Sequence, residues 1–175
     1  MGSILTLFAE KEGTRVPQAD EIGRIKNLIE LVGQGVRNAK SVAENLDFDP
    51  RQSSYYGEAA EILGFVDRKD VYMLTGLGSQ FVSSDEPTKV KLMVCAVLCN
   101  PIVSKIISSL QAHLVSSISK DDVQHLIISV GHLHGETVAR RAQTIMAWLR
   151  WLQHNSGVIS VEGDNATLES RQRTL

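Results

Sequence analysis

DPRQSSYYGEAAEILGFVDRKDVYMLTGLGSQF, at residues 49–81, is the stretch that decides the fold of this chain. Asp49 can accept hydrogen bonds from the free N–H groups at a helix start, and Pro50 suits the first helical position because the donor it lacks has no partner there. Gly64 suits the end of that helix, where a residue at positive φ is favoured. We therefore expect a helix over residues 50–63.

Helical spacing divides this expected helix into two faces. One face is expected to be buried and holds Tyr56, Ala59, Ala60 and Leu63. The other is expected to be presented and holds Arg51, Ser54, Tyr55 and Glu58. Such a helix packs on a core with one side and offers the other side to a partner.

Two short strands are expected after this helix. Phe65-Val66 starts the first strand, the charged turn Asp67-Arg68-Lys69-Asp70 reverses the chain, and residues 71–74 return beside it. Thr75 is then placed to cap a short helix. The sequence therefore predicts a β-hairpin held between two helices.

Two further helices are expected before residue 49. Asp20 opens one whose apolar residues keep helical spacing until Gly33 and Gly35 end it, and Asn38 caps a shorter one. The resulting order of helix, helix, turn, helix, strand and strand is that of a winged helix-turn-helix. In this motif one helix commonly enters the DNA major groove, and the hairpin, or wing, can touch the DNA backbone.

A second unit of the same kind is expected after the polar linker Ser84-Asp85-Glu86. Pro87 and Pro101 each begin an apolar helix, and Ser119 with Asp122 resembles a capping box. A long helix and a hairpin follow, over residues 137–153, 158–161 and 166–168. The sequence thus predicts a mainly α chain with small β-hairpins (α+β). Its four expected segments are an N-terminal arm (1–19), a first winged-helix domain (20–84), a second helical or winged-helix domain (85–168) and a C-terminal tail (169–175).

The helix expected over 137–153 carries arginine, hydroxyl and indole groups beside a narrow apolar stripe. The projecting sector holds Thr137, Arg140, Arg141, Thr144, Trp148 and Trp151. Arginine binds phosphate or guanine, threonine binds phosphate oxygens, and tryptophan stacks. These residue types favour DNA contacts. Two alternatives stay open, because the tryptophans can instead pack in the core and the arginines can form a solvated, salt-bridged face.

The overall composition is that of an ordinary soluble globular protein, with 43% hydrophobic and 22% charged residues. The net charge of −2 is unfavourable for DNA binding, which depends on neutralising phosphates. Acidic residues are concentrated in the early helices, away from Arg140 and Arg141. DNA binding depends on the electrostatic field near the contact surface rather than on the net charge of the chain. We expect weak non-specific binding, or a DNA role within a larger assembly.

Several other classes of site are not expected. His125, His132, His134 and Glu136 lack the spacing of a zinc-binding helix, and no phosphate-binding glycine loop occurs, so we predict no metal, cofactor or catalytic residues. Neither a signal peptide nor a membrane-spanning helix is found, which indicates a cytoplasmic protein.

The apolar helix from Pro87 to Leu98 contains Cys95 and is followed directly by Cys99, and these are the two cysteines of the chain. Cys95 and Cys99 share one face of this helix and are expected to be buried thiols. The helix itself is unusually apolar, and we expect it to be either a central core helix or the contact of a homodimer.

Two patterns taken together resemble a known protein family. RQSSYYGEAAEILGFVDRKDVYMLTGLGSQF and the later ETVARRAQTIMAWLRWL are similar to the paired winged-helix modules of restriction endonucleases and related phage-defence proteins. The resemblance implies duplex DNA as the ligand and a nuclease or ATPase as the partner chain, because this chain lacks the catalytic portion. It also implies a DNA-facing role for Arg51, Gln52, Tyr55, Arg140, Arg141 and Thr144.

The predicted DNA-binding set joins both reader helices and the wing turn. It consists of Arg51, Gln52, Ser54, Tyr55, Arg68, Lys69, Thr137, Arg140, Arg141, Thr144 and Trp148. The leading hypothesis is a tandem winged-helix DNA-binding protein that acts as a non-catalytic recognition subunit or regulator in a restriction or phage-defence system. The alternative is a protein-interaction adaptor of a larger complex, because winged helices also serve as docking modules and the acidic balance suits that use.

Overall fold

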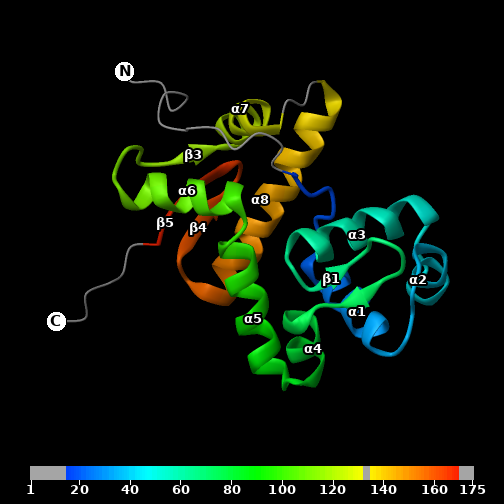
Figure 1. Ribbon diagram of the computed structural model, residues 1–175. Coiled ribbons are helices and arrows are strands. Elements are labelled where there is room, and N and C mark those ends of the chain that lie inside the picture. Colours follow the sequence, from blue (N-terminus) through cyan, green and yellow to red (C-terminus); the bar gives the residue numbers. More distant parts are fainter. Residues whose placement is uncertain (1–14, 132–134, 170–175) are drawn as a thin grey trace. The chain divides into compact units, whose positions relative to one another are not determined.

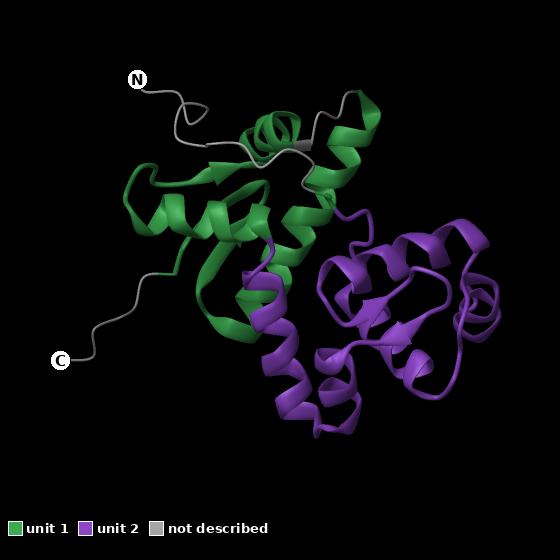
Figure 2. Cartoon of the chain, viewed as in Figure 1, with its two compact units in different colours: residues 1–16, 101–175 green, residues 17–100 purple. Residues whose placement is uncertain are grey.

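The computed structural model describes residues 15–131 and 135–169 and divides the chain into two compact units (Figures 1 and 2). Unit 2 spans residues 17–100, and unit 1 consists of residues 1–16 and 101–175. The described residues are mainly helical, with two small antiparallel sheets. The prediction of a mainly α chain with small β-hairpins is therefore confirmed. Most of the expected N-terminal arm (1–14) and C-terminal tail (170–175) lies outside the described residues.

Unit 2 begins with three helices, whose bounds are α1 (Ile22–Gly33), α2 (Ala39–Leu46) and α3 (Pro50–Ile62). The expected caps of α2 and α3 are confirmed, because Asn38 accepts from the Ser41 amide at 2.9 Å and Asp49 accepts from the Gln52 amide at 2.9 Å. α1 starts later than predicted and has no side-chain cap. Asp20 instead accepts a hydrogen bond from the Tyr56 hydroxyl at 3.2 Å, which ties α3 to the start of α1.

A two-stranded antiparallel hairpin follows α3, formed by β1 (Val66–Asp67) and β2 (Met73–Leu74). Gly64 ends α3 with a φ of +82°, a left-handed conformation that glycine adopts at little cost. Directly before the second strand, the Tyr72 amide donates to the Arg37 carbonyl at 2.7 Å. The segment between α1 and α2 therefore lies beside the hairpin at Arg37.

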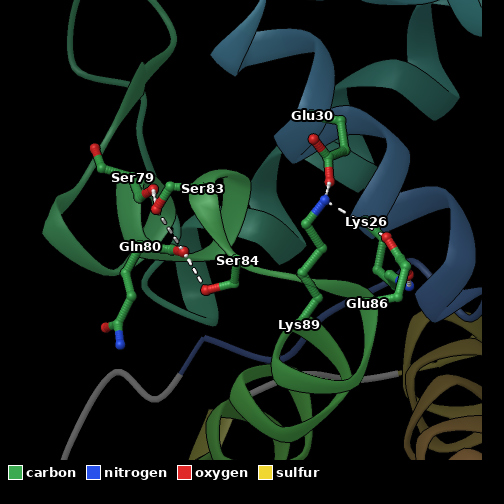
Figure 3. A network of polar contacts seen from close by, with 8 residues as sticks. All are labelled: Lys26, Glu30, Ser79, Gln80, Ser83, Ser84, Glu86 and Lys89. Carbon is green, nitrogen blue, oxygen red and sulfur yellow. Dashed lines mark hydrogen bonds and ion pairs between the residues drawn. The ribbon is translucent and has the colours of Figure 1, made fainter.

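Two more helices, α4 (Gly76–Ser83) and α5 (Glu86–Leu98), complete unit 2. Figure 3 shows Lys89 of α5 pointing toward Glu30 of α1, with Nζ 2.6 Å from Oε1. Lys26 of α1 donates to Glu86 at 3.1 Å. These hydrogen bonds raise the pKa of Lys89, chiefly through Glu30, and lower the pKa of Glu86, chiefly through Lys26. These contacts join α5 to α1, so α5 belongs to the same unit as the helices that precede it.

The predicted domain boundary at residues 84–85 is therefore corrected, because the chain divides after Asn100. The residues expected to form a polar linker instead begin α5. Asp85 is its N-cap and accepts from the Thr88 amide at 3.0 Å. Helix caps and linkers contain the same types of polar residue, so the sequence alone did not distinguish a helix start from a linker here.

The described part of unit 1 consists of three helices and a three-stranded sheet, in the order α6 (Pro101–Gln111), β3 (Ile118–Ser119), α7 (Lys120–Gly131), α8 (Glu136–Ser156), β4 (Ile159–Glu162) and β5 (Asn165–Leu168). The expected capping box is confirmed, because the Asp122 amide donates to Ser119 Oγ and the Ser119 amide donates to Asp122 Oδ2. Strand β3 was not predicted. Its two residues pair with β5, so that the strand order is β3-β5-β4.

Polar contacts attach the hairpin of unit 1 to α8. The Arg150 guanidinium donates to the Gly163 carbonyl at 2.8 Å, and the Val161 amide donates to Gln153 Oε1 at 2.9 Å. Both contacts join the second half of α8 to the strands that follow it. They leave the first turns of α8 at the opposite end of a 21-residue helix.

The same order of elements occurs in both units. A helix is followed by a short segment, two helices and an antiparallel hairpin. In unit 1 the short segment contains β3, which pairs with β5, and in unit 2 the short segment contacts the hairpin through the hydrogen bond between Tyr72 and Arg37. In unit 2 the helices are α1, α2 and α3, and in unit 1 they are α6, α7 and α8. In each unit the third helix runs directly into the hairpin.

Candidate nucleic-acid interface

Helix α3 presents an arginine, a serine and a tyrosine on its outer side. Arg51 and Ser54 are exposed and Tyr55 is half-buried, with the Arg51 guanidinium carbon 6.0 Å from the centre of the Tyr55 ring. The opposite side is buried as predicted, and Tyr56 is only 5% exposed. An arginine that rests on an aromatic face is oriented before any ligand arrives, which suits the binding of phosphate or of a base.

Gln52 is exposed at the start of α3 but takes part in a capping box. Its Oε1 accepts from the Asp49 amide at 3.4 Å, a long contact. The amide nitrogen of the side chain is the part of Gln52 that remains suited to donate to a DNA acceptor.

Arg68 belongs to the fold rather than to an open binding surface, which corrects its prediction as a DNA contact. Its guanidinium donates to the Ser54 carbonyl at 3.0 Å, lies 3.5 Å from Glu61 and covers the Tyr72 ring at 5.8 Å. Its side chain is 20% exposed. These contacts hold the hairpin against α3.

The turn of the unit 2 hairpin carries one cation that is open to solvent. The Lys69 side chain is 86% exposed and lies 3.9 Å from Asp67, a surface ion pair of small energy. Two apolar side chains, Val71 and Met73, are also exposed on this hairpin, at 46% and 57%. Sequence reasoning missed them, although they alternate with the buried Tyr72 as side chains of a strand do.

The first turns of α8 present a polar stripe at three-residue spacing. Thr137 and Arg140 are exposed as predicted, Arg141 is half-buried, and Gln143 is exposed. Gln143 was missed by sequence reasoning, although it lies three residues after Arg140 and therefore on the same face. Threonine, arginine and glutamine side chains bind phosphate, guanine and adenine respectively.

Thr144 and Trp148 are corrections to the predicted interface, because they are only 2% and 0% exposed. The Thr144 hydroxyl donates to the Arg140 carbonyl at 3.3 Å within the helix. Helix α8 packs against α7, α6 and β4, so its buried face is wider than the narrow apolar stripe that the sequence suggested. The core alternative is therefore the correct one for Trp148.

The charges of the two units give no broad basic surface. Unit 2 has nine lysines and arginines against twelve aspartates and glutamates, and the described part of unit 1 has six of each. Exposed cations at the candidate surface are local, namely Arg51, Lys69 and Arg140. Glu136 occupies the first turn of α8, where a carboxylate suits the helix dipole but repels phosphate.

Cys95 and Cys99 are exposed free thiols, so the expectation that they are buried is wrong. Among residues 15–131 and 135–169, no cluster of three or more metal-binding side chains is found, whereas His132 and His134 lie outside the described residues. No single helix in the described part of the chain is long and apolar enough to span a membrane.

Comparison with known proteins gives one match. The model of the family described as Domain of unknown function (DUF7226) matches residues 24–156. The match starts within α1 and ends with α8, so it spans helices of both units. No curated protein and no solved structure matches the chain.

Proposed function

We propose that this chain, which belongs to the DUF7226 family of domains of unknown function, is a DNA-binding protein with two winged helix-turn-helix units. The observation that carries the proposal is the recurring order of elements, in which a third helix with an exposed arginine near its start leads into an antiparallel hairpin. Helix-turn-helix proteins contact base edges with the N-terminal residues of the recognition helix. Helices α3 and α8 are the two readers.

The α8 reader uses the stripe Thr137, Arg140 and Gln143. Arg140 is suited to guanine or to a phosphate, Gln143 to adenine, and Thr137 to a phosphate at the edge of the groove. Arg141 is half-buried and contributes positive charge near this stripe. The proposed α8 set therefore contains Gln143 in place of the buried Thr144.

The α3 reader uses Arg51, Ser54 and Tyr55, and Lys69 in the hairpin turn contacts the DNA backbone. The stacked pair of Arg51 and Tyr55 supplies a guanidinium and an aromatic face on one surface. Arg68 keeps the hairpin against α3 through the Ser54 carbonyl and Glu61. The hairpin thereby has a fixed position relative to the reader helix.

The low content of exposed cations fits a recognition subunit better than an independent high-affinity binder. Few phosphates can be neutralised by Arg51, Lys69 and Arg140, so non-specific affinity is small. The resemblance to paired winged-helix modules of restriction and phage-defence proteins supports a partner chain with nuclease or ATPase activity. The proposed protein is thus the non-catalytic, duplex-reading component of such an assembly.

The test measures binding of the full chain to labelled duplex DNA by fluorescence anisotropy at several salt concentrations. R140A and R51A should each weaken binding and reduce the log–log salt slope by about 0.9 per lost phosphate contact. K91A is the matched control, because it removes one exposed cation from α5, outside both readers. Binding that is equal in R51A, R140A and K91A would show that α3 and α8 are not the readers.

A second candidate function, a protein-interaction adaptor, is favoured by one observation. Val71 and Met73 are exposed on the hairpin of a unit in which acidic residues outnumber basic ones. Exposed apolar side chains near the centre of a surface are typical of protein contacts. A wild-type chain without salt-dependent affinity for duplex DNA would favour the adaptor over the reader.

A further inference from the structure

Helix α5 carries two exposed thiols in consecutive turns. The Cys99 amide donates to the Cys95 carbonyl at 2.9 Å, so the two residues are related by one regular helical turn. Both thiols are free and exposed. They continue an exposed stripe of α5 that also contains Pro87 and Lys91, each four residues before the next. At the C-terminal end of this stripe, the side chains of Cys95 and Cys99 lie on the same face of the helix.

The spacing of this pair excludes a relaxed internal disulfide. Side chains four residues apart on a helix have Cβ atoms about 5–6 Å apart, whereas a disulfide needs about 3.5–4.5 Å. A metal ion bridges a longer gap, because each zinc–sulfur bond is about 2.3 Å and tetrahedral geometry separates the two sulfurs by about 3.8 Å. Two thiolates one helical turn apart therefore suit one shared cation.

We propose that Cys95 and Cys99 form half of a Zn²⁺ site, which the same two residues of a second copy of this chain complete. A structural zinc site takes four ligands, and no cluster of three metal-binding side chains exists among residues 15–131 and 135–169. A two-fold axis through the metal supplies the two missing thiolates from an identical surface. The site is incomplete without the second copy.

The charge at this surface suits a tetrathiolate site. One Zn²⁺ and four thiolates carry a net charge of −2, which neighbouring cations stabilise. Lys91 lies one turn before Cys95 on the same exposed stripe, and each copy contributes one such lysine. The lysines therefore offset the charge that the site gains when its thiols lose their protons.

The test titrates Zn²⁺ into the reduced, metal-free full chain and follows molecular mass by analytical ultracentrifugation. We expect saturation at one zinc per two chains, together with a doubling of mass, and Co²⁺ in place of zinc should give the absorption of thiolate coordination. C95S and C99S should each weaken zinc binding at least about tenfold, because loss of a ligand exceeds the effect of losing an outer-shell contact. The double variant should show neither zinc binding nor dimerisation.

Two matched variants test the spacing with the number of thiols held constant. K91C/C99S places the pair at 91 and 95, one turn apart, and should retain zinc-dependent dimerisation. K91C/C95S places the pair at 91 and 99, two turns apart, and should lose it. The proposal is wrong if zinc leaves the mass of the wild type unchanged, if it binds one to one without dimerisation, or if C95S/C99S behaves as the wild type.

Discussion

A Cβ atom on Gly57 would lie 2.5 Å from the hydroxyl oxygen of Tyr72. Gly57 is buried within α3, and Tyr72 comes from the hairpin that follows it. A side chain at residue 57 would therefore require the Tyr72 ring to shift. This contact, together with Arg68, sets the position of the hairpin against the candidate reader helix.

The substitution G57A should destabilise unit 2, although alanine is a better helix former than glycine. We expect a loss of about 1–3 kcal/mol in the free energy of unfolding, as for other overpacked core positions. Chemical denaturation measures it. Adding Y72F removes the nearest atom and should recover part of the loss, which a double-mutant cycle reports as coupling.

Gly23 in α1 is the matched control for this substitution, because no atom lies within 4 Å of a Cβ built there. G23A should stabilise the protein by about 0.5–1 kcal/mol. If G57A and G23A change stability in the same direction, the Tyr72 side chain does not restrict the size of residue 57.

Adjacent tyrosines in α3 should differ sharply in their contribution to stability. Tyr56 stacks on Phe48 with ring centres 5.0 Å apart and is 5% exposed, whereas Tyr55 is half-buried on the outer side. We expect Y56A to cost about 3 kcal/mol, and Y55A to cost much less while weakening DNA binding. Thermal melting of both variants checks this, and equal shifts would contradict the register of the helix.

Tyr56 should also make stability depend on alkaline pH. Burial, followed by the charges of Asp20 and Glu21, raises the pKa of Tyr56 from 10.0 to about 12. The folded state therefore holds the phenol proton more tightly than the unfolded chain does. Its contribution is fully present below pH 10 and is lost as the pH rises through about 12.

The measurement compares the unfolding free energy of the wild type with that of Y56F from pH 8 to 12. The difference should stay constant up to pH 10 and then change by about 2–3 kcal/mol to the disadvantage of the wild type. Parallel curves over the whole range would mean that Tyr56 titrates alike in the folded and unfolded states.

The face of α8 that contacts DNA can be distinguished by two neighbouring residues. Gln143 is exposed, and Thr144 is 2% exposed with its hydroxyl bonded within the helix. Q143A should weaken DNA binding without a change in stability, whereas T144V should leave DNA affinity unchanged. Anisotropy titrations at one salt concentration compare them. A loss of DNA affinity in T144V but not in Q143A would instead support the face that contains Thr144, as the sequence alone suggested.

Helix α5 should be needed for the stability of unit 2. A fragment of residues 17–100 retains the contacts of Lys89 with Glu30 and of Lys26 with Glu86, and a fragment of residues 17–84 loses both. We expect the longer fragment to unfold cooperatively and at a higher temperature, as measured by circular dichroism. Equal melting temperatures of the two fragments would instead support a domain boundary at residue 84.

The sequence by itself determined most of the helices and several of their caps. Asn38, Asp49 and Thr75 cap the helices they were expected to cap, and Gly64 ends α3 in the left-handed conformation. These features depend on residues within about one turn, so the sequence contains all of their partners. The buried side of α1 was also predicted correctly, because its five buried apolar residues keep helical spacing.

The tertiary structure alone decided which side chains remain available for a ligand. Thr144 and Trp148 became buried because α8 has neighbours on several sides, and Arg68 became a structural contact because Glu61 and the Ser54 carbonyl lie within its reach. Strand β3 and the assignment of α5 to unit 2 likewise depend on partners that are distant in sequence. Helical periodicity gives the direction of a side chain, but only the arrangement of the neighbouring elements determines what that side chain meets.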